Sequence, residues 1–330
     1  EELTGGGDRI PLESLGFHFP QFCDKVVDNR QCYHQKDPSN AIRNGVRDFA
    51  IDSGMPFYDV RNWQGLLRNL IIRTTESGDL MVIMVFREVD PSNIILLEYL
   101  KNTFPQITSL WSVLNPKKND TIYDLPHDLY HGVPYITESL PPFHPNDNPS
   151  RVRIGPQSFF QTNTLQADAL YRITAGFAGL TGTEHVYDLY SGTGAISCYI
   201  SRYTGRVTGI ESVAMAVEDA RINAALNNLN NLNFFSGEAE KWMTPDIIRQ
   251  EGAPDIIITD PPRNGMHEKV IRSILGCAPS KIVYVSCNPA TQARDILLLS
   301  ESYQLEKCQP VDMFPHTQHV ENVALMIKRS

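Results

Sequence analysis

Several features that define specialised classes of protein are missing from this sequence of 330 residues. Its longest apolar run, residues 80–86, is far shorter than the roughly 18 residues that a membrane-spanning helix needs. Its six cysteines form no C-x-x-C pair and are too sparse for a disulfide scaffold in a chain of this length. No internal repeat or low-complexity segment is visible. We therefore expect a soluble cytoplasmic protein with free thiols and no membrane contact.

Basic residues are also scarce. The chain has 29 Lys and Arg against 38 Asp and Glu, a formal net charge of −9 that does not by itself indicate a nucleic-acid-binding protein. The acidic excess lies mainly in residues 1–150, with 13 basic and 20 acidic residues, whereas residues 151–330 have 16 and 18. The first residue is Glu1 rather than Met, and no secretory signal pattern follows it, so we expect a piece of a longer protein.

A proline-rich segment at residues 140–150 predicts a domain boundary. It reads LPPFHPNDNPS, and its four prolines cannot continue a helix or a central strand. We expect one domain over residues 1–150 and a second over residues 151–330, because each part has the length of an ordinary domain.

The two parts differ in their patterns of hydrophobic residues. Before the boundary, residues 68–73 and 80–86 read as strands, and residues 39–53 and 94–104 have helical spacing, which predicts a smaller α+β domain. After it, a helical stretch at residues 164–178 is followed by alternating strands and helices. This alternation is typical of an α/β fold with a mostly parallel, doubly wound sheet.

A glycine turn follows the first expected strand of the second part, residues 185–189. The turn has the spacing D-x-x-x-G-x-G, from Asp188 through Gly192 to Gly194. Glycines at the carboxyl end of a parallel strand let a ligand approach the backbone closely. The third glycine of a dinucleotide-binding pattern would fall at Ser197, so a pyrophosphate cradle is disfavoured.

Acidic residues follow the next two expected strands. Glu211, after residues 206–210, could accept hydrogen bonds from both hydroxyls of a ribose. Glu238, after residues 231–235, could lie near an adenine amino group. Taken singly, each is equally well interpreted as a solvated carboxylate, and the glycine turn as a simple loop. In this order, however, the three features resemble the S-adenosylmethionine (SAM) sites of Rossmann-like methyltransferases.

Two further expected strands end in residues that carry chemistry. Residues 255–259 lead into Asp260 within D-P-P-R, and residues 281–286 lead into Cys287 within C-N-P. Both ends are expected to face the same crevice of a parallel sheet. The alternatives are a rigid turn for D-P-P-R and an inert buried thiol for Cys287.

A thiol in a methyltransferase suits methylation of a pyrimidine at carbon 5. That carbon is a poor nucleophile until a thiolate adds to carbon 6, and a base must afterwards remove the carbon 5 proton. Glu321 opens an otherwise apolar run and is a candidate for that base, with a capping or salt-bridge role as the alternative. His316 and His319 have no accompanying set of Cys or carboxylate ligands, so we expect no metal site.

Five motifs together resemble the RNA uracil-5-methyltransferase family, which makes 5-methyluridine in transfer and ribosomal RNA. They are QSFFQTN at 157–163, DLYSGTG at 188–194, DPPR at 260–263, SCNP at 286–289 and HVENVALM at 319–326. The resemblance implies SAM as the cofactor, RNA as the partner, Cys287 as the nucleophile and Glu321 as the base that abstracts the proton. It also implies that SAM is contacted by four side chains: Gln161, Tyr190, Glu211 and Asp260.

The resemblance also bears on the substrate and on what this chain lacks. Without it, residues 158–161 would be interpreted as a helix entrance with aromatic core residues. SFFQTN is more similar to the enzymes of 23S ribosomal RNA than to those of transfer RNA, so we expect a ribosomal RNA substrate. The family often has Cys in place of Ser191 and Asn in place of Ala195. Many ribosomal RNA members carry an RNA-binding barrel and a four-cysteine iron–sulfur site, neither of which is visible, since Cys23 and Cys32 alone cannot hold a cluster.

RNA recognition is expected to involve residues 1–150, with the target uridine flipped out of its stack to reach Cys287. Five arginines in this part are candidates for phosphate contacts, with a solvated surface side chain as the alternative for each: Arg43, Arg47, Arg61, Arg68 and Arg73.

Rival functions can be separated by the same residues. A transfer RNA uracil-5-methyltransferase would share all of the chemistry. An RNA cytosine-5-methyltransferase would place a second Cys in the fourth-strand motif, where this chain has D-P-P-R. An amino-group methyltransferase would have an aromatic residue in place of Arg263 and no use for Cys287. A SAM-binding or RNA-binding factor without catalysis would not need both Cys287 and Glu321.

Overall fold

The chain divides into two compact units, Glu1–Ile136 and Thr137–Ser330. The structure is a computed structural model that describes residues 2–3, 9–10, 13–19, 22 and 24–329, so Cys23 lies outside the described residues. The division comes before the proline-rich segment, because that segment joins β9 (Ile136–Leu140) to β10 (Ser150–Ile154), and these two strands pair with each other. Strand β10 packs on a helix of the second unit, so the segment belongs to that unit rather than to a boundary.

A four-stranded sheet organises the first unit. Its strands in spatial order are β5 (Leu67–Thr74), β6 (Leu80–Phe86), β7 (Ser109–Leu114) and β8 (His127–Gly132). The central pair β6–β7 is parallel and is connected through helix α2 (Pro91–Thr103), whereas the two outer pairs are antiparallel. Helix α1 (Ser39–Asp52) packs against α2, and both contribute to the apolar core. The strands and helices expected before the boundary are thus present.

Two short hairpins precede this sheet. They are β1 (Glu2–Leu3) with β2 (Arg9–Ile10) and β3 (Phe17–His18) with β4 (Val26–Val27).

Arg43 and Arg68 are neither phosphate contacts nor solvated surface side chains, the two alternatives considered for them. Arg43 is buried and donates hydrogen bonds to the backbone carbonyl of Asn29 and to the side chain of Asn40. The Arg68 side chain is also buried, and it donates to carbonyl oxygens of the loop over residues 115–119. Two other candidates form ion pairs inside the unit: Arg47 with Asp28 and Asp48, and Arg61 with Asp24. A phosphate contact by Arg73 stays a prediction.

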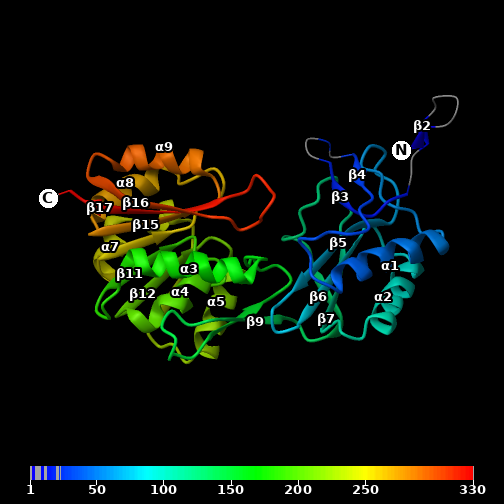
Figure 1. The fold of residues 1–330 in the computed structure, drawn as a ribbon, viewed down its shortest axis with the longest axis horizontal. Coiled ribbons are helices and arrows are strands. Elements are labelled where there is room, and N and C mark those ends of the chain that lie inside the picture. The colour runs from blue at the N-terminus through cyan, green and yellow to red at the C-terminus, as the bar shows by residue number, and fades with distance from the viewer. Residues whose placement is uncertain (1, 4–8, 11–12, 20–21, 23, 330) are drawn as a thin grey trace. The chain divides into compact units, whose positions relative to one another are not determined.

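The second unit contains a seven-stranded sheet in the order β13-β12-β11-β14-β15-β17-β16 (Figure 1). Its strands are β11 (His185–Leu189), β12 (Arg206–Glu211), β13 (Leu232–Ser236), β14 (Ile256–Thr259), β15 (Lys281–Ser286), β16 (Tyr303–Val311) and β17 (Glu321–Lys328). The first five in spatial order are parallel, and β17 runs antiparallel to both β15 and β16. The predicted mostly parallel α/β fold is confirmed.

Helices cover both faces of this sheet. On one face, α3 (Thr164–Ala178), α4 (Ala195–Ile200) and α5 (Ala214–Leu226) pack in sequence, with a short 3-10 turn at Ser201–Tyr203. On the other face lie α6 (Ala239–Trp242), α7 (Pro245–Glu251), α8 (Glu268–Cys277) and α9 (Pro289–Leu299). Among the described residues, no helix has both the length and the apolar content needed to cross a bilayer.

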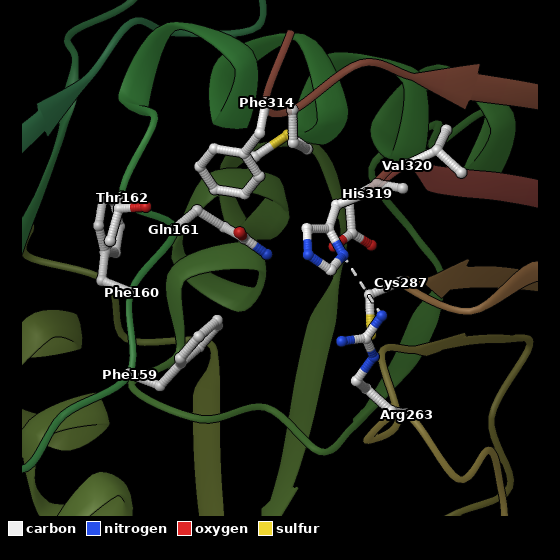
Figure 2. A pocket seen from close by; sticks show the side chains of 11 residues that line it. Phe159, Phe160, Gln161, Thr162, Arg263, Cys287, Phe314, His319 and Val320 are labelled. Atoms are coloured by element: carbon white, nitrogen blue, oxygen red, sulfur yellow. Dashed lines mark hydrogen bonds between the residues drawn. The ribbon is translucent and has the colours of Figure 1, made fainter. Parts of the chain in front are cut away.

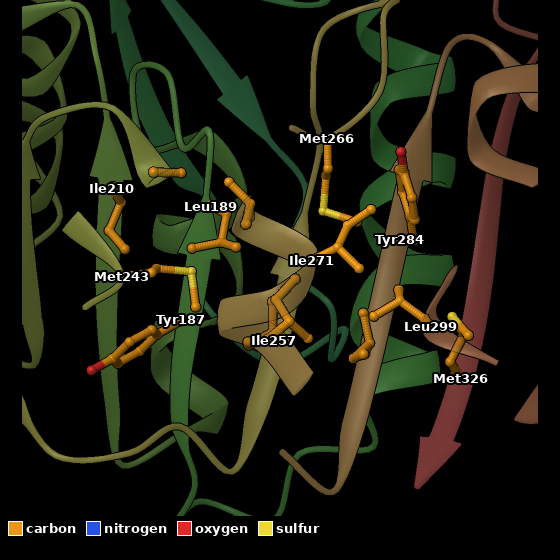
Figure 3. Packing of buried hydrophobic residues seen from close by; sticks show 14 of the residues in the cluster. Tyr187, Leu189, Ile210, Met243, Ile257, Met266, Ile271, Tyr284, Leu299 and Met326 are labelled. Carbon is orange, nitrogen blue, oxygen red and sulfur yellow. The ribbon is translucent and has the colours of Figure 1, made fainter. Parts of the chain in front are cut away.

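Burial from both sides explains why the central strands are so apolar. In Figure 3, Leu189, Ile257 and Tyr284 project from β11, β14 and β15 toward Ile271 of α8 and Leu299 of α9. A parallel strand between two helical layers presents both of its faces to the core, so near-continuous apolar runs are required. Such packing fixes the carboxyl ends of these strands in a single row, where the candidate site residues follow.

Candidate active site

An apolar cavity of about 180 Å³ opens at the carboxyl ends of the central strands (Figure 2). It is lined by Phe159, Phe160, Gln161, Thr162, Arg263, Cys287, Met313, Phe314, His319, Val320 and Glu321. An engineered cavity of roughly 150 Å³ is sufficient for benzene, so a six-membered pyrimidine ring has room here. Both predicted catalytic residues, Cys287 and Glu321, therefore line one cavity that can hold a nucleobase.

The pairing of β15 with β17 brings these two residues together. Ser286, the last residue of β15, is the register partner of Asn322 in the antiparallel strand β17. Cys287 follows Ser286 in the chain and Glu321 precedes Asn322, so both lie at the same end of this strand pair. Residues far apart in sequence thus reach one point because the final strand runs opposite to its neighbour.

The charges at this point favour protonated side chains. Glu321 is only 8% exposed, and burial raises its pKa to about 7, while the cation of Arg263 acts in the opposite direction. Its Oε2 atom has no hydrogen-bond partner among the described residues. The pKa of Cys287 is raised by burial first and then by the charges of Glu321 and Asp260. A buried carboxyl with a pKa near neutrality and a free oxygen is suited to accepting a proton.

Asp260 lies at the end of β14 beside the same cluster. Burial raises its pKa well above the ordinary value, and the charges of Glu321 and Asp188 raise it further. Its backbone N–H donates to Leu189 of the neighbouring strand at 3.3 Å. Three carboxyl groups therefore share this edge of the sheet, and such a cluster favours a cationic ligand.

Arg263 and His319 lie next to each other at the cavity. One guanidinium nitrogen of Arg263, Nη2, is 3.4 Å from Nδ1 of His319, the contact that is dashed in Figure 2. The backbone oxygen of Arg263 accepts hydrogen bonds from the side chains of Asn288 and Thr291 at the start of α9. The D-P-P-R loop is therefore fastened to the segment that follows Cys287. Within the described ranges, no group of three or more His, Cys, Asp or Glu residues is placed to hold a metal ion.

Gln161 is buried and points into the cavity beside Phe159 and Phe314 (Figure 2). It lies just before Asn163, whose side chain caps α3 and also donates to the carbonyl oxygen of Met313 at 2.9 Å. Residues alone did not single out Gln161, and the family resemblance did. Gln161 is a polar amide within an aromatic run, two residues before a helix cap. This pattern is the signal that could have indicated a residue lining a binding cavity.

The glycine turn after β11 is closed by Glu211. The carboxylate of Glu211 accepts hydrogen bonds from the backbone N–H groups of Gly192 at 3.0 Å and Val213 at 2.8 Å. Gly194 has φ of 75°, and a Cβ there would lie 2.8 Å from Cζ of Phe234. A Cβ at Gly192 would meet nothing within 4 Å. The turn is therefore packed against Phe234 at Gly194, whereas the space beside Gly192 is open.

Two buried polar atoms beside this turn lack partners among the described residues: Oδ1 of Asp188 and Oγ of Ser191. Burial raises the pKa of Asp188 to about 7, although its other oxygen accepts a 2.5 Å hydrogen bond from Ser197. Unpaired buried acceptors are costly, so such atoms indicate a ligand with donors. A ligand with ammonium and sulfonium charges, such as SAM, fits these acceptors and the open turn.

Two predicted cofactor residues lie less centrally. The ring of Tyr190 packs against the core cluster on the α6–α9 face, and burial raises its pKa to about 12. Glu238 is half-exposed at the start of α6 and forms a 2.5 Å ion pair with Lys241. Contacts from these two side chains to a cofactor stay predictions.

Comparisons with known proteins agree with this geometry. The family model described as tRNA (Uracil-5-)-methyltransferase matches residues 133–329. A protein of Porphyromonas gingivalis described as an uncharacterized RNA methyltransferase is 50% identical over 335 residues, covering 100% of this chain and 70% of that protein. One of Bacteroides thetaiotaomicron is 47% identical over 319 residues, covering 96% and 69%.

A solved structure is similar over almost the whole chain. The Pyrococcus abyssi tRNA (uracil-54, C5)-methyltransferase, in complex with S-adenosyl-L-homocysteine, superposes with a TM-score of 0.75 and 30% identity. The match covers 94% of this chain and 73% of that one. The chain therefore belongs to the tRNA (uracil-5-)-methyltransferase family and is an RNA methyltransferase of the uracil-5 type.

Proposed function

We propose that this chain methylates carbon 5 of a uridine in 23S ribosomal RNA through a covalent adduct between Cys287 and carbon 6. The observation that carries the proposal is the convergence of Cys287 and Glu321 at the paired ends of β15 and β17, inside a cavity of nucleobase size. A uridine can enter such a cavity only after leaving its base stack.

The methyl donor is SAM, which supplies an electrophilic methyl group. The side chains of Asp188, Ser191 and Asp260 and the open turn at Gly192 are the groups that would hold it. Glu211 shapes the same turn from the next strand. The product form of this cofactor, S-adenosyl-L-homocysteine, is bound in the similar Pyrococcus abyssi enzyme.

Cys287 activates the base. Its thiolate forms a bond to carbon 6, and the electrons of the carbon 5–carbon 6 double bond move to carbon 5 as an enolate. Because burial and neighbouring carboxylates raise the pKa of Cys287, the thiol needs a proton acceptor close by before it adds. Arg263 is the nearby cation that opposes this rise.

Glu321 completes the turnover. After carbon 5 has gained the methyl group, the Glu321 carboxylate accepts the proton from carbon 5. The electrons of that carbon–hydrogen bond restore the double bond, and the bond between sulfur and carbon 6 breaks. Cys287 leaves as a thiolate and the 5-methyluracil ring is aromatic again.

The identity of the RNA can be tested directly. Ribosomal and transfer RNA are purified separately from cells with and without the protein, and their nucleosides are measured by mass spectrometry. We expect 5-methyluridine to disappear from the ribosomal fraction. Its loss from transfer RNA alone would move the substrate to that class, and loss of 5-methylcytidine would favour the cytosine-5 alternative. An unchanged nucleoside profile would contradict the proposed activity.

A further inference from the structure

One tryptophan of the first unit is exposed in an unusual backbone conformation. The chain has three tryptophans, of which Trp111 and Trp242 are buried at 7% and 8% exposure, whereas Trp63 is 45% exposed. Trp63 also has φ of 53°, in the left-handed region. Bulky side chains rarely adopt this conformation, and it persists where the surrounding structure imposes it.

The loop that carries Trp63 is braced at several points. Asp59 and Gln64 exchange backbone hydrogen bonds of 2.7 and 3.4 Å at its base. The Asp59 carboxylate accepts from the backbone of Arg61 at 2.8 Å and from the side chain of Asn62 at 2.6 Å. These hydrogen bonds therefore fix the conformation of the loop, and the loop holds the indole toward solvent.

A second braced loop places a cation on the indole. The Nζ atom of Lys118 lies 3.3 Å from the centroid of the Trp63 ring. The loop with Lys118 is held by Arg68, whose side chain is 1% exposed and donates to the carbonyl oxygens of Asn115 at 2.8 Å and Asn119 at 3.1 Å. Lys118 is exposed and forms no ion pair with any residue that the structure describes. The buried side chain of Arg68 thus positions Lys118 through the loop that it holds.

We propose that Trp63 and Lys118 form a contact site for a single-stranded segment of the substrate RNA. A base stacks on the face of the indole opposite Lys118, and the ammonium group of Lys118 meets a backbone phosphate. This pairing of an exposed aromatic ring with an unpaired cation is the chemistry by which proteins bind single-stranded nucleic acid. A cation without a carboxylate partner also suits a polyanion, because no neighbouring negative charge opposes its approach.

The inference rests on the proposed function in one respect, that the substrate is RNA. A protein surface or a second copy of the chain could also cover an indole. The free ammonium group beside the ring favours RNA, because an aromatic contact with a protein does not require an unpaired cation.

Fluorescence separates these cases, because Trp63 is the exposed member of the three tryptophans. The probe is single-stranded oligouridylate, titrated into the full chain carrying Cys287→Ala so that no covalent adduct forms. We expect the RNA to quench the tryptophan emission, and the quenching to vanish in Trp63→Phe while Trp111 and Trp242 remain. Trp63→Ala should weaken binding about five- to a hundredfold, whereas Trp63→Phe should retain most of the affinity.

Salt dependence tests the cation separately. Lys118→Ala should lower the slope of log affinity against log salt concentration by about 0.7, the value for one phosphate contact on a single strand. Matched controls in the same unit are Tyr33→Ala, which removes another exposed aromatic ring, and Lys101→Ala, whose ammonium pairs with Glu98. Neither control should change affinity by more than about twofold.

The results distinguish a failure of this site from a failure of the proposed function. If RNA does not quench the emission, or if Trp63→Ala binds as tightly as its parent, the site is refuted even where the protein methylates RNA. The emission of Trp63 is the difference between the spectra of the parent and Trp63→Phe without RNA, and a maximum typical of a buried indole in that difference would show that another surface covers Trp63 and would refute the site. If methylation fails but the quenching and the affinity loss are found, the site stands and the proposed activity falls. Circular dichroism of each variant checks folding, and the quenching of the parent protein requires no change at Trp63 or Lys118.

Discussion

Ser286 and Asn322 are register partners at the end of the antiparallel pair β15–β17, and they place Cys287 beside Glu321. Behind this pair, Gln292 of α9 accepts a 2.5 Å hydrogen bond from the side chain of Asn322 and donates at 2.8 Å to the backbone of Tyr284. One buried amide therefore links the strand that ends at the thiol to the strand that begins at the carboxylate. Any change in this link should alter the geometry between nucleophile and base.

Replacing the thiol should stop the reaction but not cofactor binding. We expect Cys287→Ala to reduce methyl transfer from radiolabelled SAM to background, because carbon 5 is then never activated. SAM affinity, measured by calorimetry, should stay within about twofold, since the cofactor acceptors lie on other strands. Cys32→Ala, which removes a half-buried thiol of the first unit, is the matched control and should remain active. Turnover by Cys287→Ala would rule out the covalent mechanism.

Replacing the base should trap the adduct. In Glu321→Gln the thiol can still add to carbon 6, but no carboxylate removes the carbon 5 proton, so protein and RNA should stay joined. The adduct is measured as a slow band on a denaturing gel. The double variant Cys287→Ala with Glu321→Gln should lose that band. A clean gel for Glu321→Gln alone would count against Glu321 as the base.

Activity and stability should change in opposite directions with pH. The pKa of Glu321 is raised to about 7, so its base form appears, and the methylation rate should rise, as pH passes through 7. Because the folded protein binds this proton more tightly than the unfolded chain, the associated stability is present below about pH 4 and is lost as pH rises toward 7. The free energy of unfolding, measured with denaturant, should therefore fall less between pH 5 and pH 8 in Glu321→Gln than in the unsubstituted protein. The difference should be about 2–3 kcal/mol. An equal loss in both proteins would contradict this assignment.

The amide of Gln292 should matter for the second half of the reaction. Gln292→Ala leaves the Nδ2 atom of the buried Asn322 without its partner, which should cost about 1–3 kcal/mol of unfolding free energy. It should also raise the fraction of trapped adduct, because Glu321 is no longer held beside Cys287. Asn227→Ala is the control, since Asn227 is a buried amide that bonds to the backbone of Arg151, away from the cavity. The control should lose stability without accumulating adduct, and equal adduct in both variants would refute the positioning role.

The two turn glycines should respond differently to alanine. Gly194→Ala should lose about 2–4 kcal/mol of stability, because the new Cβ meets Phe234 and φ is positive. Gly192→Ala should cost about 1 kcal/mol, from the positive φ alone. The new Cβ points into the space expected for SAM. The variant should therefore lose more free energy of SAM binding than free energy of unfolding. Undiminished SAM affinity in Gly192→Ala, measured by calorimetry, would place the cofactor elsewhere.

Much of the fold could be predicted because local patterns and packing agree. The strand over residues 185–189 and the helix over residues 164–178 have the expected bounds, since buried parallel strands must be continuously apolar and the helix is capped by Asn163 and Gly179. The proline-rich segment did not mark the division between the units. Proline predicts where a helix or strand ends, but it does not indicate which of the two units a segment packs against.

The roles of polar residues were harder to foresee. A charged side chain looks the same in sequence whether it faces solvent or backbone carbonyls, so the sequence offers Arg68 as a phosphate contact or a solvated side chain, although it is buried. Gln161 was indicated only by the family resemblance, because an amide in an aromatic run has no periodicity of its own.

The sequence alone determined the class of fold and the kinds of chemistry present: alternating apolar runs, a glycine turn, one cysteine after a strand and one glutamate before another. Hydrophobic periodicity and backbone restrictions are local properties, so they can be read without coordinates. Tertiary structure decided that the cysteine and the glutamate share one cavity and that burial raises the pKa of Glu321 to about 7. It also decided that the buried side chain of Arg68 holds the loop from which Lys118 contacts the exposed ring of Trp63. Distance and burial depend on which strands pair and which helices cover them, and those are properties of the whole packed chain.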